Sequence, residues 1–141
     1  MNEHTALQQT RQQRPMLQQT EAPLSEERPW GRWTILYEAP GVKVKLIEVL
    51  PGHRLSLQYH RHRSEHWVCV AGTADAVIGD VSLTLRPMRS AVIGIGTIHR
   101  LGNSGPEPVA IIEVQKGDDL REEDIVRLED DYHRAAKTSE R

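Results

Sequence analysis

Closely spaced turn signals divide the middle of this chain into short segments, and this spacing limits the possible folds more than any other feature. The signals contain Gly, Pro or Asn, as at Pro51-Gly52 and Gly79-Asp80. Runs of β-branched and other apolar residues lie between them and predict strands over 33–37, 42–50, 54–60, 66–70, 74–78, 81–85, 91–95 and 109–115. Many short strands joined by such turns are typical of a β-sandwich or a small barrel. The sequence therefore predicts an all-β fold.

The two ends of the chain differ from this middle in composition. Residues 1–27 are rich in Gln and Thr and contain few large apolar side chains. Such a segment cannot bury enough surface to offset its ordering entropy, which predicts a flexible N-terminal tail. A short helix between Leu7 and Leu17 is the alternative interpretation. Residues 133–141 are short and charged and predict a C-terminal tail, so the folded domain is expected over 28–132.

One short helix is predicted near the C-terminal end of this domain. The segment Arg121-Glu-Glu-Asp follows a Gly-Asp-Asp turn signal. Beyond it, Ile125, Leu128 and Tyr132 would share one face of a helix.

Composition excludes several classes of function. With 18 Lys and Arg against 20 Asp and Glu, the chain of 141 residues has a net charge of -2 and no basic surplus for binding nucleic acid. No run approaches the roughly 20 apolar residues that a membrane helix needs. The N-terminus lacks the apolar stretch of a signal peptide, and the single Cys69 allows no intramolecular disulfide. A cytoplasmic protein is therefore expected.

Histidines gather in one stretch of the sequence. Four of the seven fall within fourteen consecutive positions: His53, His60, His62 and His66. The alternation of a strand places Gln58 and His60 on one face, together with Arg54. Glu65 begins the next predicted strand and can fold back opposite His60, whereas His66 points the other way. In GIGTIHRLGN, His99 follows another strand and a glycine turn.

These positions suggest a metal site. Four side chains could surround one divalent cation: Gln58, His60, Glu65 and His99. Two imidazole nitrogens and two oxygens with room for water suit a catalytic site rather than a closed structural one. None of the usual Cys/His zinc spacings matches this pattern, and a solvated basic turn around Arg61 and Arg63 is the alternative. The spacing alone leaves both hypotheses open.

Two stretches resemble the motifs of the cupin family. The segment from Gly52 to Gly72 is similar to the first motif, with Gln58 where most cupins have the first His. GIGTIHRLGN resembles the second motif, although Gly94 stands where many cupins have Pro. More narrowly, RPWG, VKVKLIEVLPG, RLSLQYHRHRSEHWVCVAGTA, GTIHRLGN, IIEVQKG and DIVRLEDDY resemble type II mannose-6-phosphate isomerases. This resemblance runs from about residue 28 to 134 and departs at His133, where the family usually has Gly.

The resemblance implies a fold, a reaction and a cofactor. The fold is the cupin barrel, a double-stranded β-helix or jelly roll. The reaction is the metal-dependent interconversion of mannose 6-phosphate and fructose 6-phosphate through an enediol, with zinc or manganese as the favoured cation. In this family the domain often follows a mannose-1-phosphate guanylyltransferase of the GDP-mannose pathway. The present sequence has no glycine-rich nucleotide loop, so a stand-alone isomerase domain is expected. The habit of cupins to pair through strands favours a homodimer.

Candidate bases and phosphate ligands follow from this reaction. Glu113 interrupts an apolar strand. Strand alternation places His62 on the same side as the predicted metal ligands, so either residue could take a proton from carbon. Alternatively, Glu113 orients a ligand and His62 is exposed to solvent. The candidates for substrate binding are Arg54, Arg127 and Lys45. An Arg fork suits phosphate better than Lys, and for Lys45 and its neighbour Lys43 a solvated strand face is the favoured alternative.

Two other functions remain open at this point. A cupin oxygenase would favour two His and one carboxylate with open positions for oxygen, which Gln58 does not match. A non-catalytic metal-containing cupin that binds or senses sugar phosphates is the main alternative. Measuring isomerisation separates this sensor from an enzyme, and measuring oxygen consumption tests the oxygenase.

Overall fold

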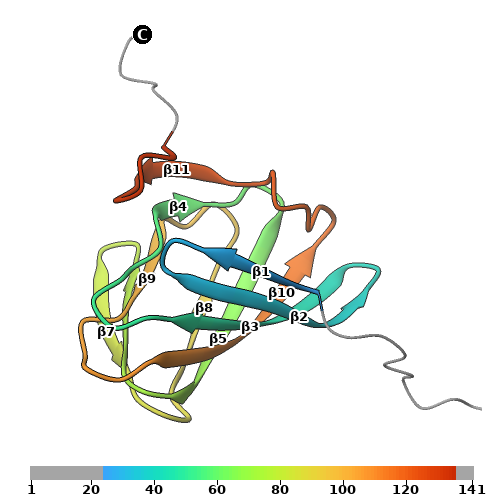
Figure 1. Cartoon of the computed structure of the whole chain (residues 1–141). Coiled ribbons are helices and arrows are strands. Elements are labelled where there is room, and N and C mark those ends of the chain that lie inside the picture. The colour runs from blue at the N-terminus through green and yellow to red at the C-terminus, as the bar shows by residue number, and fades with distance from the viewer. Residues whose placement is uncertain (1–23, 136–141) are drawn as a thin grey trace, which may run out of the picture.

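Two antiparallel sheets make up the fold in the computed structural model, which describes residues 24–135 (Figure 1). The larger sheet contains, in spatial order, β1 (Ser25–Arg28), β2 (Gly31–Ala39), β3 (Val42–Val49), β10 (Val109–Gly117), β5 (Arg63–Ala71) and β8 (Ser90–Ile93). The smaller contains β11 (Val126–Glu129), β4 (Leu57–Tyr59), β9 (His99–Gly102), β6 (Ala74–Ile78) and β7 (Val81–Leu85). The all-β barrel that the sequence predicts is confirmed.

Strand alternation gives the larger sheet one buried and one outer face. Along β3 and β10 every second side chain is buried, and the register pairs these inward residues directly. At one end of the barrel Ile47 lies opposite Ile111, and further along Lys45 lies opposite Glu113. The interior therefore changes from apolar to polar along the barrel, which places charged groups at one end only.

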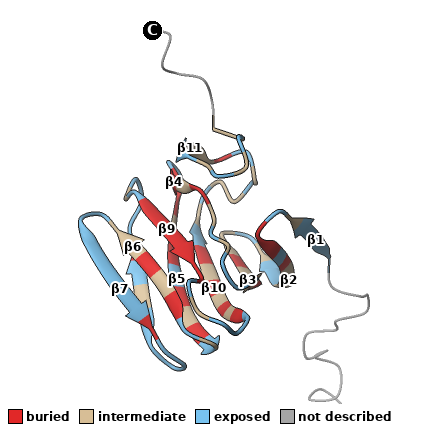
Figure 2. Ribbon diagram, turned by 60° about the vertical axis from the view of Figure 1, so that its left-hand side comes forward, coloured by how far each residue is buried: buried red, intermediate tan, exposed pale blue. Residues whose placement is uncertain are grey.

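The apolar end forms the hydrophobic core. Because the chain has no Phe, its three tryptophans supply the large side chains of this core and also border the polar end. They pack together with smaller aliphatic residues: Ile47, Val49, Leu85, Ile93, Leu101, Val109 and Ile111. Burial of each such side chain stabilises the fold by roughly 1.5–3 kcal/mol. Figure 2 shows that β9 is buried along its length, whereas β7 is mostly exposed. The packed apolar core therefore supports the polar end of the barrel.

Each of the eight predicted strands has a counterpart in the structure, but three further strands were missed. β1 begins at Ser25 and thus overlaps the end of the predicted tail 1–27. The predicted strand over 54–60 is regular only in β4. The rest of the N-terminal tail, with its alternative helix between Leu7 and Leu17, and residues 136–141 lie outside the described part of the chain.

The predicted C-terminal helix is wrong. Its residues form a turn and then β11, which pairs with the edge of β4 (Figure 1). The edge of β4 offers unpaired backbone N–H and C=O groups with which this segment can pair, whereas a short isolated helix is only marginally stable in water. Beyond β11, His133 has φ 62, in the left-handed region that favours glycine, which explains why a Gly suits this turn. Within residues 24–135 no helix is long and apolar enough to cross a membrane.

Candidate metal centre

The polar end of the barrel encloses a cavity between the two sheets. It has a volume of about 90 Å³ and opens to solvent at its mouth. Its walls contain the four predicted ligands together with three further residues that the sequence suggested: Gln58, His60, Glu65, His99, Lys45, Glu113 and Arg127. The barrel therefore gathers residues from both sheets around one space.

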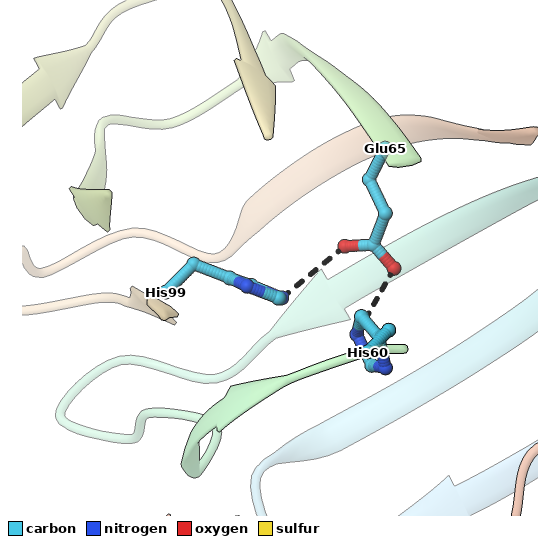
Figure 3. Close-up of side chains that lie close together, drawn as sticks. All are labelled: His60, Glu65 and His99. Carbon is cyan, nitrogen blue, oxygen red and sulfur yellow. Dashed lines mark ion pairs between the residues drawn. The ribbon is translucent and has the colours of Figure 1, made fainter. Parts of the chain in front are cut away.

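Three of the predicted metal ligands converge in this cavity (Figure 3). His60 follows β4, Glu65 lies on β5 and His99 begins β9, and all three are buried. His60 Nε2 lies 3.3 Å from Glu65 Oε2, and His99 Nε2 lies 3.4 Å from Glu65 Oε1. One ligand atom from each of the three residues lies within 4.8 Å of the other two. A single divalent cation could therefore be held between them.

Backbone carbonyls fix which nitrogen each histidine presents. His60 Nδ1 lies 2.6 Å from the carbonyl oxygen of Asp124, and His99 Nδ1 lies 2.8 Å from that of Thr97. A ring nitrogen that donates its proton to a carbonyl leaves the lone pair on the other nitrogen, which is the usual arrangement in metal-bound histidines. Both Nε2 atoms face Glu65, so the donor set fits a cation.

Charge and burial set the protonation states around Glu65. Burial alone would raise the pKa of Glu65, but the hydrogen bond with His99 and the positive charges nearby hold it well below its usual range. Burial lowers the pKa of His60 to about 4, which keeps its imidazole neutral. Burial also opposes charge on His99, but the contact with Glu65 raises the pKa of that ring. The cluster thus offers a carboxylate and a neutral imidazole at neutral pH.

Gln58 stands next to this cluster on the opposite strand. It pairs with His99 in the register of β4 and β9, and its side chain is buried against the cavity. Its Nε2 donates to the carbonyl oxygen of Ser56 at 3.4 Å. The amide oxygen therefore remains the group that can act as a ligand.

Arg63 was missed as a site residue and entered the sequence analysis only through the alternative, a solvated basic turn. Its side chain is only 6% exposed, and its Nε donates to Glu65 Oε2 at 3.0 Å. Its Nη2 lies 3.3 Å from His60 Nε2, so the guanidinium contacts two of the predicted ligands. Strand alternation could have revealed this position, because Arg63 precedes Glu65 by two residues on one strand and so points to the same face.

Glu113 and Lys45 face the same cavity from β10 and β3. Trp67 Nε1 donates to Glu113 Oε2 at 3.0 Å, and Gln115 Nε2 donates to Glu113 Oε1 at 2.5 Å. Burial, followed by the negative charge of Glu65, raises the pKa of Glu113 to about 7. Lys45 forms an ion pair with Glu122.

The solvated strand face expected for the two lysines is wrong. Lys45 is 3% exposed, and its ammonium lies 4.3 Å from the ring centre of Trp33. Lys43 is also buried and donates to the carbonyl oxygen of Leu120 at 2.8 Å. Both side chains point into the barrel because they share the inward parity of Ile47.

Two predicted site residues lie outside the cavity. Arg54 does not share the ligand face, because regular pairing stops before β4 and its guanidinium turns outward to Asp131, with bonds of 2.7 and 2.9 Å. His62 sits in a turn whose backbone N–H groups donate to the carboxylate of Asp124. Its half-exposed ring lies 3.8 Å from Asp118, away from the ligands. Strand alternation was expected to place both residues on the side of the ligands, but neither residue lies in a regular strand.

Solved structures share this architecture. A Klebsiella pneumoniae protein with a double-stranded beta-helix domain aligns with a TM-score of 0.61 at 20% identity, covering 81% of this chain and 85% of that one. The capsular polysaccharide assembling protein CapF of Staphylococcus aureus aligns with a TM-score of 0.67 at 18% identity, covering 78% and 33%. Fold and site together define a cupin barrel with a buried cluster that could hold a metal ion.

Sequence comparison gives the family. The chain belongs to the family described as mannose-6-phosphate isomerase C-terminal, whose model matches residues 17–130. It is 48% identical over 110 residues to the alginate biosynthesis protein AlgA of Pseudomonas aeruginosa, covering 78% of this chain and 23% of that protein. It is 41% identical over 107 residues to a mannose-1-phosphate guanylyltransferase of Escherichia coli, covering 76% and 23%. The chain thus spans about a quarter of the length of these curated relatives.

Proposed function

We propose that this chain is a metal-dependent isomerase that interconverts mannose 6-phosphate and fructose 6-phosphate. Family membership supports the substrate class. The observation that carries the proposal is the position of Glu113, a buried carboxyl group with a pKa of about 7 in the same cavity as His60, Glu65 and His99. A group that titrates near neutral pH beside a candidate metal centre is suited to moving a proton.

The cation would be held by Gln58, His60, Glu65 and His99. A bound divalent cation would supply a Lewis acid that stabilises negative charge on the sugar oxygens. The remaining chemistry falls to the residues of the chain, and above all to Glu113.

In the direction from aldose to ketose, the ionised Glu113 takes the proton from C2 of the sugar. Its protonated form then returns a proton to C1 of the enediol, while the hydroxyl proton of O2 passes to O1, which completes the transfer without a net change in the enzyme. A pKa near the working pH allows the same group to accept and then donate. Trp67 and Gln115 each bond one carboxylate oxygen, which fixes the orientation of the group while leaving further lone pairs for the substrate.

A coupled assay for fructose 6-phosphate tests the proposal directly. Turnover should disappear with a chelator and return with added zinc or manganese. Glu113→Gln should lower kcat by about 10²–10⁴-fold with little change in bound metal. Glu48→Gln, which alters a carboxylate on the outer face of β3 with 40% side-chain exposure, is the matched control and should retain activity.

Isotope exchange and metal screening separate this proposal from its alternative. In heavy water, deuterium should enter at C1 or C2 of the recovered sugar phosphate. If the protein binds metal and sugar phosphate but shows no turnover with zinc, manganese, cobalt or nickel, a non-catalytic sugar-phosphate sensor accounts for it better.

A further inference from the structure

Asp124 contacts the candidate metal centre twice, once through its backbone and once through its side chain. It belongs to residues 118–125, which join β10 to β11 (Figure 1), and it is only 8% exposed. We propose that Asp124 is a positioning residue, which sets the orientation of His60 and thereby the affinity of the centre for its cation. This inference rests on the cation site of the proposed function but not on the isomerase reaction.

The backbone carbonyl of Asp124 lies against the ring of His60. His60 Nδ1 lies 2.6 Å from this oxygen, and because a carbonyl can only accept, the ring donates its Nδ1 proton to it. The lone pair of the neutral ring is then on Nε2, which lies 3.3 Å from Glu65 Oε2. A turned ring or the other tautomer would take this lone pair away from the cluster. The position of one carbonyl therefore controls whether His60 can bind a cation.

The carboxylate of Asp124 holds the turn that follows His60. Its Oδ1 accepts from the backbone N–H of Arg61 at 2.9 Å, and its Oδ2 accepts from the backbone N–H of His62 at 3.0 Å. Hydrogen bonds to an ionised acceptor are stronger than those between neutral groups. Asp124 thus binds residues 60–62 from both its side chain and its backbone, so the carboxylate keeps the carbonyl in place beside the His60 ring.

Two lysines of β3 hold the same connection independently of Asp124. Lys43 Nζ donates to the carbonyl oxygen of Leu120 at 2.8 Å, and Lys45 forms an ion pair with Glu122. Loss of the Asp124 carboxylate should therefore leave the connection attached to the barrel and shift it only near His60. A substitution at this position is expected to disturb the metal centre more than the fold.

The zinc affinity of the full chain, measured by competition with a chelator, tests this role. Asp124→Ala should weaken zinc binding by about ten- to a hundredfold, the usual effect of removing an outer partner of a metal-bound histidine. Asp124→Asn keeps an acceptor for one of the two N–H groups and should recover part of the affinity. Asp118→Ala is the matched control, because it removes a carboxylate of the same connection with 88% side-chain exposure, and it should bind zinc like the unmodified chain.

The proton on the His60 ring provides a readout that a general loss of stability would not change. A long-range proton–nitrogen NMR spectrum of the metal-free chain shows which ring nitrogen is protonated, and the His60 signals are those absent from His60→Ala. The unmodified chain and Asp118→Ala should carry this proton on Nδ1. Asp124→Ala should show a mixture of the two tautomers, because the carbonyl no longer selects one of them. Circular dichroism shows whether each variant is folded, and if Asp124→Ala does not fold, the same two measurements on Asp124→Asn decide.

The outcomes separate this role of Asp124 from the proposed function. Unchanged zinc affinity on loss of the Asp124 carboxylate, an equal loss in Asp118→Ala, or an unchanged His60 tautomer would overturn the positioning role. If mannose 6-phosphate is not isomerised but zinc affinity and the His60 tautomer both depend on Asp124, the positioning role is supported and the proposed reaction fails. If isomerisation occurs while Asp124→Ala keeps both the zinc affinity and the tautomer, the positioning role fails and the proposed function stands.

Discussion

Replacing Glu113 by Gln should change how the stability of the protein depends on pH. The carboxyl group has an ordinary pKa of 4.5, and burial followed by the charge of Glu65 raises it to about 7 in the folded chain. Below pH 4.5 both the folded and unfolded states hold the proton, so the raised pKa costs nothing. Between 4.5 and about 7 only the folded state holds it, so stability is lost as the pH rises through this window.

The size of this effect follows from the same two values. A rise of the pKa from 4.5 to about 7 corresponds to about 3 kcal/mol of stability lost once the pH exceeds 7. Gln has the same shape and cannot ionise, so the variant should escape this loss. It also replaces an acceptor of Trp67 or Gln115 with an N–H donor, but that cost is the same at every pH.

Urea unfolding of both proteins in a chelator, measured from about pH 4.5 to 8, checks the expectation. The free energy of unfolding of Glu113→Gln, relative to the unmodified chain, should increase by about 3 kcal/mol over this range. Glu48→Gln, which changes an exposed carboxylate on β3, should show no comparable increase. Parallel curves for Glu113→Gln and the unmodified chain would refute the raised pKa and weaken the case for Glu113 as the base.

Replacement of His99 by Ala should remove most of the bound zinc or manganese, as measured by mass spectrometry. His66→Ala changes an exposed residue and should leave the metal bound. The opposite pattern would show that the ligand set is wrong. Because the contact with Glu65 raises the pKa of His99, protons should begin to compete with the cation at a pH above the ordinary histidine value of about 6.5. Equilibrium dialysis should show metal affinity falling as the pH drops through this region, and a constant affinity would contradict the role of His99. Removal of residues 1–23 should leave Tm unchanged, whereas removal of residues 1–28 should lower it by several degrees, because β1 pairs with β2. An equal Tm for the two truncations would show that β1 contributes nothing to stability.

Local rules explain the features that could be predicted from the sequence. Turn signals and short apolar runs are properties of neighbouring residues, and they were enough to predict an all-β sandwich or small barrel. Strand alternation likewise predicted that Gln58 and His60 face one way, and that Glu65 points inward while His66 points outward. These side chains have the predicted burial because the strands that carry them are regular or end beside them.

The tertiary structure decided the rest, since it depends on contacts between distant segments. The last segment became β11 rather than a helix because β4 offers an edge with which its backbone can pair. That pairing brings Arg127 beside Gln58, while Arg54 turns outward where the pairing is interrupted. Arg63 contacts His60 because the chain crosses from one sheet to the other between these two residues. Alternation along a strand is a local property, but which irregular segment meets which edge is fixed only when the whole barrel closes.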